Sequence, residues 1–151
     1  MTFFEDLARC TYFTGHPELI AVGWLDDKHS FRSGRIEPRL FETLAALLMD
    51  PWQPFVVAGV HDCELCRFSG GPGVVRVGDS RIYVGSTNLF VPHGDAVFIA
   101  PSLILHYVDA HDYAPPDLFA KAVLECPPMR SAAYMELVRR HKLDDLMPSS
   151  L

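Results

Sequence analysis

Hydrophobic residues in the second half of the chain gather in short runs that turn-forming residues separate. Four such runs, rich in β-branched and aromatic residues, occupy positions 74–77, 81–84, 87–91 and 96–100. The segments between them, Gly-Asp-Ser, Gly-Ser and Pro-His-Gly-Asp, suit tight turns. The pattern therefore predicts a meander of β-hairpins.

Two further apolar runs lie earlier in the chain. The run at 19–25 is flanked by Gly-His-Pro and by Asp-Asp-Lys-His-Ser, which predicts a strand with turns at both ends. The run at 55–60, Phe-Val-Val-Ala-Gly-Val, is rich in β-branched residues and predicts a buried strand.

Helical periodicity first appears at residues 37–50. Apolar residues recur there on one face, at Leu40, Phe41, Leu44, Leu47 and Leu48. Pro38 suits the first turn of this helix, and Pro51 ends it.

Three more helices are expected later in the chain. They span 100–113, opened by Pro101, then 116–125, opened by Pro116, and finally 131–143. The last five residues, Met-Pro-Ser-Ser-Leu, are expected to form a frayed tail.

The order of these elements is strand, helix, a series of strands and then a series of helices. This order favours an α+β fold, in which a small, mostly antiparallel sheet carries helices packed on one side. The chain has no internal repeat, linker or low-complexity segment, so we expect residues 1–151 to form a single domain.

Composition and charge narrow the class of partner. Apolar residues make up 49% of the chain and charged residues 21%, which is typical of a folded, soluble protein. The formal net charge is −6 and no run of Lys or Arg occurs, which disfavours both nucleic acid and anionic membranes. A protein or small-molecule partner is expected instead.

The N-terminal residues predict the compartment. The start Met-Thr-Phe-Phe-Glu-Asp lacks the basic and apolar regions of a signal peptide, and no apolar run is long enough to span a bilayer. We therefore expect a cytoplasmic protein, in which four cysteines act as thiols or metal ligands rather than disulfides.

The most informative motif is His-x-Cys-x2-Cys, formed by His61, Cys63 and Cys66. Two cysteines at this spacing can direct both sulfurs at one cation. His106 and His111 follow as His-x4-His, which completes a Cys2His2 set of the kind that binds zinc. The metal would tie the loop after the 55–60 run to the predicted helix 100–113.

Helix geometry leaves the fourth ligand open. His106 and His111 would lie roughly 140° apart around a regular helix, so both reach one metal only if the helix loosens near its end. Otherwise His61 supplies the fourth ligand, because it projects to the same side as Cys63 in an extended segment. His61 and His111 therefore compete for that position.

Three segments together resemble a known family. The segments at 22–31, 59–66 and 100–123 resemble small, uncharacterised bacterial proteins that form a domain of unknown function. Their shared pattern pairs His-x-Cys-x2-Cys with His-Tyr-x3-His-x-Tyr-x-Pro-Pro. The resemblance implies that the pattern includes His61, Cys63, Cys66, His106, Tyr107, His111, Tyr113, Pro115 and Pro116. It implies no activity.

Three functions fit the motif. The first is a structural zinc in a binding or interaction protein, with a closed shell of four ligands. The second is a zinc-dependent hydrolase with an open position, where His61 or His111 acts as general base and Asp62, Glu64 or Asp109 orients it.

The third function is a thiol redox or metal-responsive regulator. A thioredoxin-like dithiol opens a helix, whereas Arg-Phe-Ser-Gly-Gly-Pro-Gly follows Cys66 and cannot continue one, which argues against redox catalysis. Outside the motif, the acidic pairs at 26–27 and 144–145 are expected in exposed loops.

Overall fold

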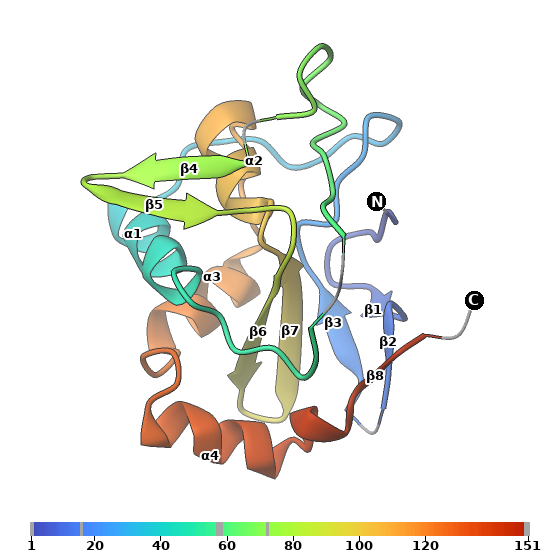
Figure 1. The fold of residues 1–151 in the computed structure, drawn as a ribbon, viewed down its shortest axis with the longest axis vertical. Coiled ribbons are helices and arrows are strands. Elements are labelled where there is room, and N and C mark those ends of the chain that lie inside the picture. Colours follow the sequence, from blue (N-terminus) through green and yellow to red (C-terminus); the bar gives the residue numbers. More distant parts are fainter. Residues whose placement is uncertain (1, 16, 57–58, 72, 150–151) are drawn as a thin grey trace.

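A four-stranded sheet organises the protein (Figure 1). The computed structural model describes residues 2–15, 17–56, 59–71 and 73–149. The strands, in their order across the sheet, are β1 (Arg9–Cys10), β3 (Leu19–Ala21), β7 (Ala96–Pro101) and β6 (Asn88–His93). β3 pairs with β7 in parallel, and the other two pairings are antiparallel.

The four predicted runs form two separate hairpins rather than one continuous meander. β4 (Val74–Val77) pairs with β5 (Ser80–Tyr83) in a sheet of two strands, while β6 and β7 pair inside the larger sheet. A third two-stranded sheet joins β2 (Phe13–Thr14) to β8 (Met147–Pro148).

Four helices complete the part of the chain that the structure describes. They are α1 (Pro38–Leu47), α2 (Ile104–His111), α3 (Asp117–Glu125) and α4 (Ala132–Arg140), and a short 3-10 helix, η1 (Leu143–Asp145), follows them. Pro116 is the N-cap of α3, in agreement with the prediction that this proline opens the helix. Pro101 instead ends β7, so α2 begins later than the sequence pattern indicates.

Both faces of the sheet are buried, which explains the nearly continuous apolar runs of β6 and β7. One face packs against α1, α2 and α3, through side chains such as Val91, Phe98, Leu44 and Phe119. The α+β class with a mostly antiparallel sheet is therefore confirmed.

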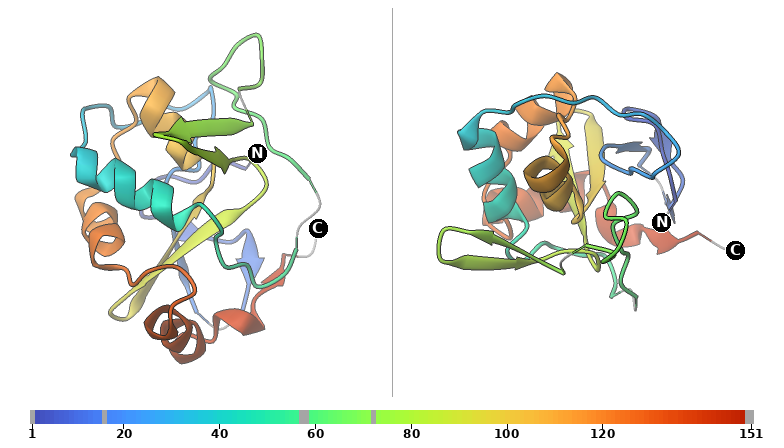
Figure 2. Two further views of the ribbon diagram at one scale, coloured as in Figure 1. Left: turned by 60° about the vertical axis from the view of Figure 1, so that its left-hand side comes forward. Right: turned by 90° about the horizontal axis from the view of Figure 1, so that it is seen from above.

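The fourth helix extends this arrangement to the opposite face. α4 contributes Tyr134 and Val138 to a second apolar cluster that includes Phe90 and Ile99. The Tyr134 hydroxyl donates a hydrogen bond of 2.8 Å to the Phe90 carbonyl. Figures 1 and 2 show α4 beneath the turn of the β6–β7 hairpin, apart from the other helices.

The predicted buried strand at 55–60 is wrong for the residues that the structure describes. No strand is assigned to 55–56 or 59–60, and Val56 and Val60 are 95% and 70% exposed. Residues 57 and 58 lie outside the described residues. The edge of β6 is partnered by a side chain: the Gln53 amide exchanges two hydrogen bonds with the Asn88 backbone, of 2.6 and 3.1 Å.

The C-terminal segment is also more ordered than expected. Met147 and Pro148 pair with Thr14 and Phe13, so the predicted frayed tail begins with a short strand. Buried Leu143 and Leu146 hold this segment against the second cluster. Among the described helices, none has the length and apolar composition needed to cross a bilayer.

Candidate metal centre

The loop from His61 to Gly71 carries the two cysteines of the motif. Its ends are held by backbone hydrogen bonds, from His61 N to Gly85 O at 2.7 Å and from Cys63 N to Gly70 O at 2.6 Å. A tight turn follows, because Cys66 N donates to Cys63 O at 3.3 Å. These bonds fold the loop so that both sulfurs face α2.

Gly71 lets the loop close over the site. Its φ of +86° is a conformation that glycine adopts without strain. A Cβ at this position would lie 2.9 Å from Cys63 Cβ and 3.5 Å from His106 Nε2. A glycine at position 71 is therefore needed on steric grounds for the loop to close against Cys63 and His106.

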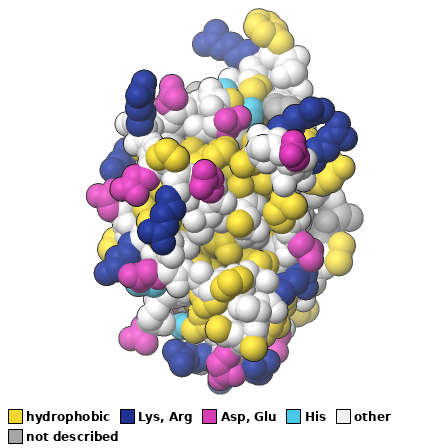
Figure 3. All heavy atoms as spheres, turned by 90° about the vertical axis from the view of Figure 1, so that its left-hand side faces the viewer, with side chains coloured by type: hydrophobic (Ala, Val, Ile, Leu, Met, Phe, Trp, Pro, Cys, Tyr) yellow, Lys and Arg dark blue, Asp and Glu magenta, His cyan; other side chains and the backbone are white. Residues whose placement is uncertain are grey.

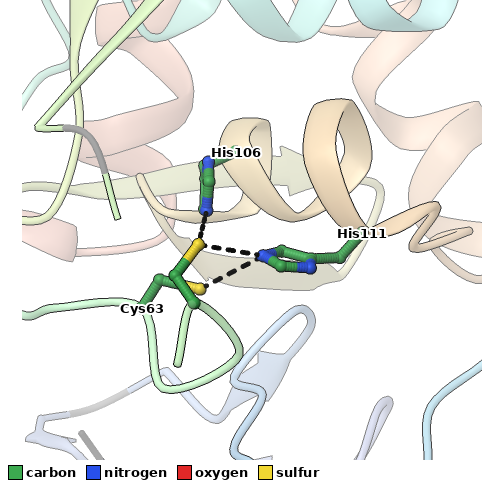
Figure 4. A group of neighbouring side chains, drawn as sticks. Cys63, His106 and His111 are labelled. Carbon is green, nitrogen blue, oxygen red and sulfur yellow. Dashed lines mark hydrogen bonds between the residues drawn. The ribbon is translucent and has the colours of Figure 1, made fainter. Parts of the chain in front are cut away.

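Helix α2 presents both histidines to this loop (Figure 4). The helix does not loosen as the sequence argument required: His111 is its last residue, and Asp112 then adopts a left-handed φ of 54°. Helical side chains lean toward the N-terminus, so the His111 ring reaches back along the helix. The centroids of the His106 and His111 rings are consequently only 5.0 Å apart.

Three of the sulfur–nitrogen distances in the cluster are close to those of a tetrahedral zinc site. Cys63 Sγ lies 3.5 Å from His111 Nε2, while Cys66 Sγ lies 3.3 Å from His106 Nε2 and 3.4 Å from His111 Nε2. All four ligand atoms lie within 4.8 Å of one another. Ideal tetrahedral bonds of about 2.3 Å to sulfur and about 2.0 Å to nitrogen would place S and N roughly 3.6 Å apart.

Burial sets the electrostatics of the ligands. Cys63 and His106 are 1% and 3% exposed, whereas Cys66 and His111 are half-buried. Burial raises the pKa of the Cys63 thiol to about 11. Burial, with a smaller contribution from the nearby His111, lowers the pKa of His106. Without metal, the buried side chains of Cys63 and His106 therefore favour their neutral forms.

His61 lies outside the cluster. Among the described residues, the group that could hold a metal consists of Cys63, Cys66, His106 and His111. His61 instead lines a small hollow with Gly85 and Asn88. It is half-buried, and this burial lowers its pKa.

Tyr107 lies beside the cluster on α2. Its side chain is buried, and its pKa is raised by burial first and then by the nearby charges of Cys63, Glu64 and Asp26. The buried phenol therefore stays neutral at physiological pH.

Asp26 is a buried polar residue near the start of the chain. It was predicted to lie in an exposed loop, yet it is only 9% exposed, whereas Asp27, Asp144 and Asp145 are exposed as predicted. Its carboxylate accepts hydrogen bonds from His29 Nδ1 at 2.8 Å and from the backbone N–H groups of Lys28 and His29. Asp followed by turn residues is a signal for this local arrangement.

A second polar contact involves the buried residue Tyr113. Its hydroxyl donates to Asp6 at 2.8 Å, and the other Asp6 oxygen accepts from Gly23 N at 2.9 Å. This pair fixes the chain just after α2 to the N-terminal segment. No local pattern pairs residues 107 positions apart.

A hollow beside α1 lies away from the loop that carries Cys63 and Cys66. It has a volume of about 590 Å³ and is lined by α1 residues such as Ala46 and Leu47 together with Cys126 and Met129. Figure 3 shows the side of the molecule that carries α1, where hydrophobic side chains lie between scattered acidic and basic ones.

Comparison with known proteins identifies the family. No curated protein and no solved structure matches the chain. One family model, described as a domain of unknown function, matches residues 2–124 of the 151, a range that includes all four residues of the cluster and ends before α4. The protein therefore belongs to the DUF7919 family, a domain of unknown function.

Proposed function

We propose that the protein is a zinc-binding protein in which Cys63, Cys66, His106 and His111 form a closed, structural site. The single observation that carries this proposal is the set of S–N distances of 3.3 to 3.5 Å, close to the edge of a zinc tetrahedron. We further propose that residues 1–151 act as one domain in the reducing cytoplasm, where these thiols stay reduced.

The donor set supports zinc. Two thiolates with two imidazoles suit zinc better than magnesium or calcium, which prefer oxygen ligands. Two bound thiolates would neutralise the dication, so the zinc and its four ligands together would carry no net charge in this partly buried site.

The ligand count supports a structural role over a hydrolytic one. Four protein ligands leave no position for a metal-bound water, and His61 lies outside the group. The metal would join the loop at 61–71 to α2, two segments that are distant in sequence. Its binding free energy would then contribute to folding.

Metal analysis and cobalt substitution test the proposal directly. The purified protein should contain one equivalent of zinc, and the cobalt form should show the visible bands of tetrahedral cobalt with two thiolates. X-ray absorption should give two sulfur and two nitrogen neighbours. A metal-free preparation that takes up no zinc would refute the site, and a shell with a water oxygen would favour the hydrolase instead.

The partial exposure of Cys66 and His111 favours one alternative, a metal-responsive regulator. Ligands at the surface allow faster metal exchange than fully buried ones. A thiol reagent distinguishes the two roles. Zinc-protected thiols that react only after chelation support the structural site, whereas fast reaction with release of zinc supports the regulator.

A further inference from the structure

Two arginines lie directly opposite each other on the outer face of the β4–β5 hairpin. Arg76 and Arg81 are register partners, while Val75 and Ile82 on the other face are 3% and 1% exposed. Residues in register across two strands have Cβ atoms about 5 Å apart. Figure 2 shows the hairpin as an arm at one side of the molecule.

This arrangement is unfavourable by itself. Like charges directly opposite each other destabilise a pair of strands. Both arginines are exposed, and neither forms an ion pair or a hydrogen bond with another residue of the described chain through its side chain. The protein carries a net charge of −6, so an unpaired cationic pair is a local exception.

An exposed aromatic ring lies on the same face. Tyr83 follows Arg81 by two residues, which places it about 7 Å further along the strand. Its side chain is 66% exposed. Tyr83 also lines a hollow of about 390 Å³, together with Met49 and Phe55.

We propose that this face binds a small phosphate monoester that carries an aromatic ring, such as a nucleoside monophosphate. A phosphate monoester carries a charge of about −1.5 to −2 at neutral pH, which neutralises both arginines. Each guanidinium can donate two hydrogen bonds to phosphate oxygens. The ring of the ligand lies against Tyr83 at the entrance of this hollow, beside Met49 and Phe55.

The binding surface favours a small ligand over nucleic acid. A nucleic-acid site needs a stripe of positive charge along several phosphates. Here two arginines provide one phosphate site, on a protein that is acidic overall. The β4–β5 hairpin provides none of the proposed metal ligands, so phosphate binding at this face does not require the metal.

Titration of the purified protein, residues 1–151, tests the proposal. The probes are adenosine 5′-monophosphate, ribose 5-phosphate and inorganic phosphate, followed by calorimetry and by thermal melting. The variants are the double substitution Arg76→Gln/Arg81→Gln and the single substitution Tyr83→Ser. The matched control, Arg35→Gln/Arg140→Gln, removes the same charge from arginines elsewhere on the surface.

The nucleotide should bind the wild type more tightly than ribose 5-phosphate does. The Arg76→Gln/Arg81→Gln variant should lose at least about tenfold in affinity for every phosphate probe, while the control retains its affinity. Tyr83→Ser should remove only the preference for the nucleotide. Without ligand, the arginine variant should melt at the same temperature as the wild type or higher, so loss of binding cannot reflect unfolding.

Three results would overturn the proposal. One is the absence of binding at millimolar nucleotide. Another is equal affinity in the arginine variant and its control. The third is self-association of the arginine variant with unchanged phosphate binding, which would assign the arginines to protection of the exposed hairpin edges.

Discussion

His106 Nε2 lies 3.3 Å from Cys66 Sγ, although 40 residues separate them in the sequence. The intervening chain forms both hairpins, β4–β5 and β6–β7, before it returns as α2. A metal at this contact would therefore join two segments that are distant in sequence. Because it would bind only the folded arrangement, its binding free energy would stabilise the folded state.

Cys63→Ser should lower both zinc content and stability. A ligand that binds only the folded protein stabilises it by about 4 kcal/mol when its free concentration exceeds its Kd a thousandfold. We expect most of this stabilisation to disappear, as measured by urea unfolding with and without zinc. Cys126→Ser, at a half-buried thiol outside the cluster, should keep the response to zinc. An equal response in both variants would contradict the ligand assignment.

His61 and His111 should behave differently when each is replaced by Gln. His111→Gln removes a donor whose Nε2 lies 3.4 Å from Cys66 Sγ, so zinc affinity should fall by at least about tenfold. His61→Gln should retain one equivalent of zinc with unchanged affinity. Competition with a coloured chelator measures both. If zinc affinity falls in His61→Gln and is unchanged in His111→Gln, His61 is the fourth ligand.

Gly71→Ala should weaken the metal site through backbone strain and a steric clash. The added Cβ would lie 2.9 Å from Cys63 Cβ, and the φ of +86° disfavours any side chain. We expect a loss of about 1–3 kcal/mol in unfolding free energy, together with weaker zinc binding. Gly73→Ala is the matched control, because no atom lies within 4 Å of its added Cβ. Similar effects in the two variants would argue against a tightly closed loop.

Asp26→Asn should change how stability depends on pH. Burial acts to raise the pKa of Asp26, but hydrogen bonds from the His29 side chain and the Lys28 and His29 backbone outweigh it and lower the pKa. A lowered pKa stabilises the folded state above the unfolded value of about 3.9, and this contribution disappears as the pH falls through the folded value.

The free energy of unfolding of the wild type should therefore exceed that of the Asp26→Asn variant by about 1–3 kcal/mol at pH 6. This difference should vanish near pH 2. Urea unfolding of both proteins across this range measures the difference. If the difference in unfolding free energy persists near pH 2, packing and not charge explains the effect of the substitution.

Tyr134→Phe tests the attachment of α4 to the sheet. The substitution removes the hydroxyl that donates to Phe90 O at 2.8 Å and leaves a buried carbonyl without this donor. The unfolding free energy should fall by about 1–2 kcal/mol, with the metal content unchanged. Tyr83→Phe removes a hydroxyl from an exposed residue and should have little effect on stability.

Local patterns predicted most of the secondary structure. The runs at 74–77, 81–84, 87–91 and 96–100 correspond to β4–β7, because turn residues separate β-forming residues at short range. The periodic segment at 37–50 contains α1 for the same kind of local reason. The strand predicted at 55–60 is wrong because a strand also needs a neighbouring strand with free backbone groups. The Gln53 side chain occupies the nearby edge of β6.

The sequence motif predicted which residues make up the candidate site. Two cysteines and two histidines at metal-ligand spacing were apparent from residue types alone. The choice between His61 and His111 depended on where α2 ends and on how far its side chains lean. Only the tertiary structure brings the loop at 61–71 against α2, because the parallel pairing of β3 with β7 and the burial of both sheet faces depend on contacts between distant segments.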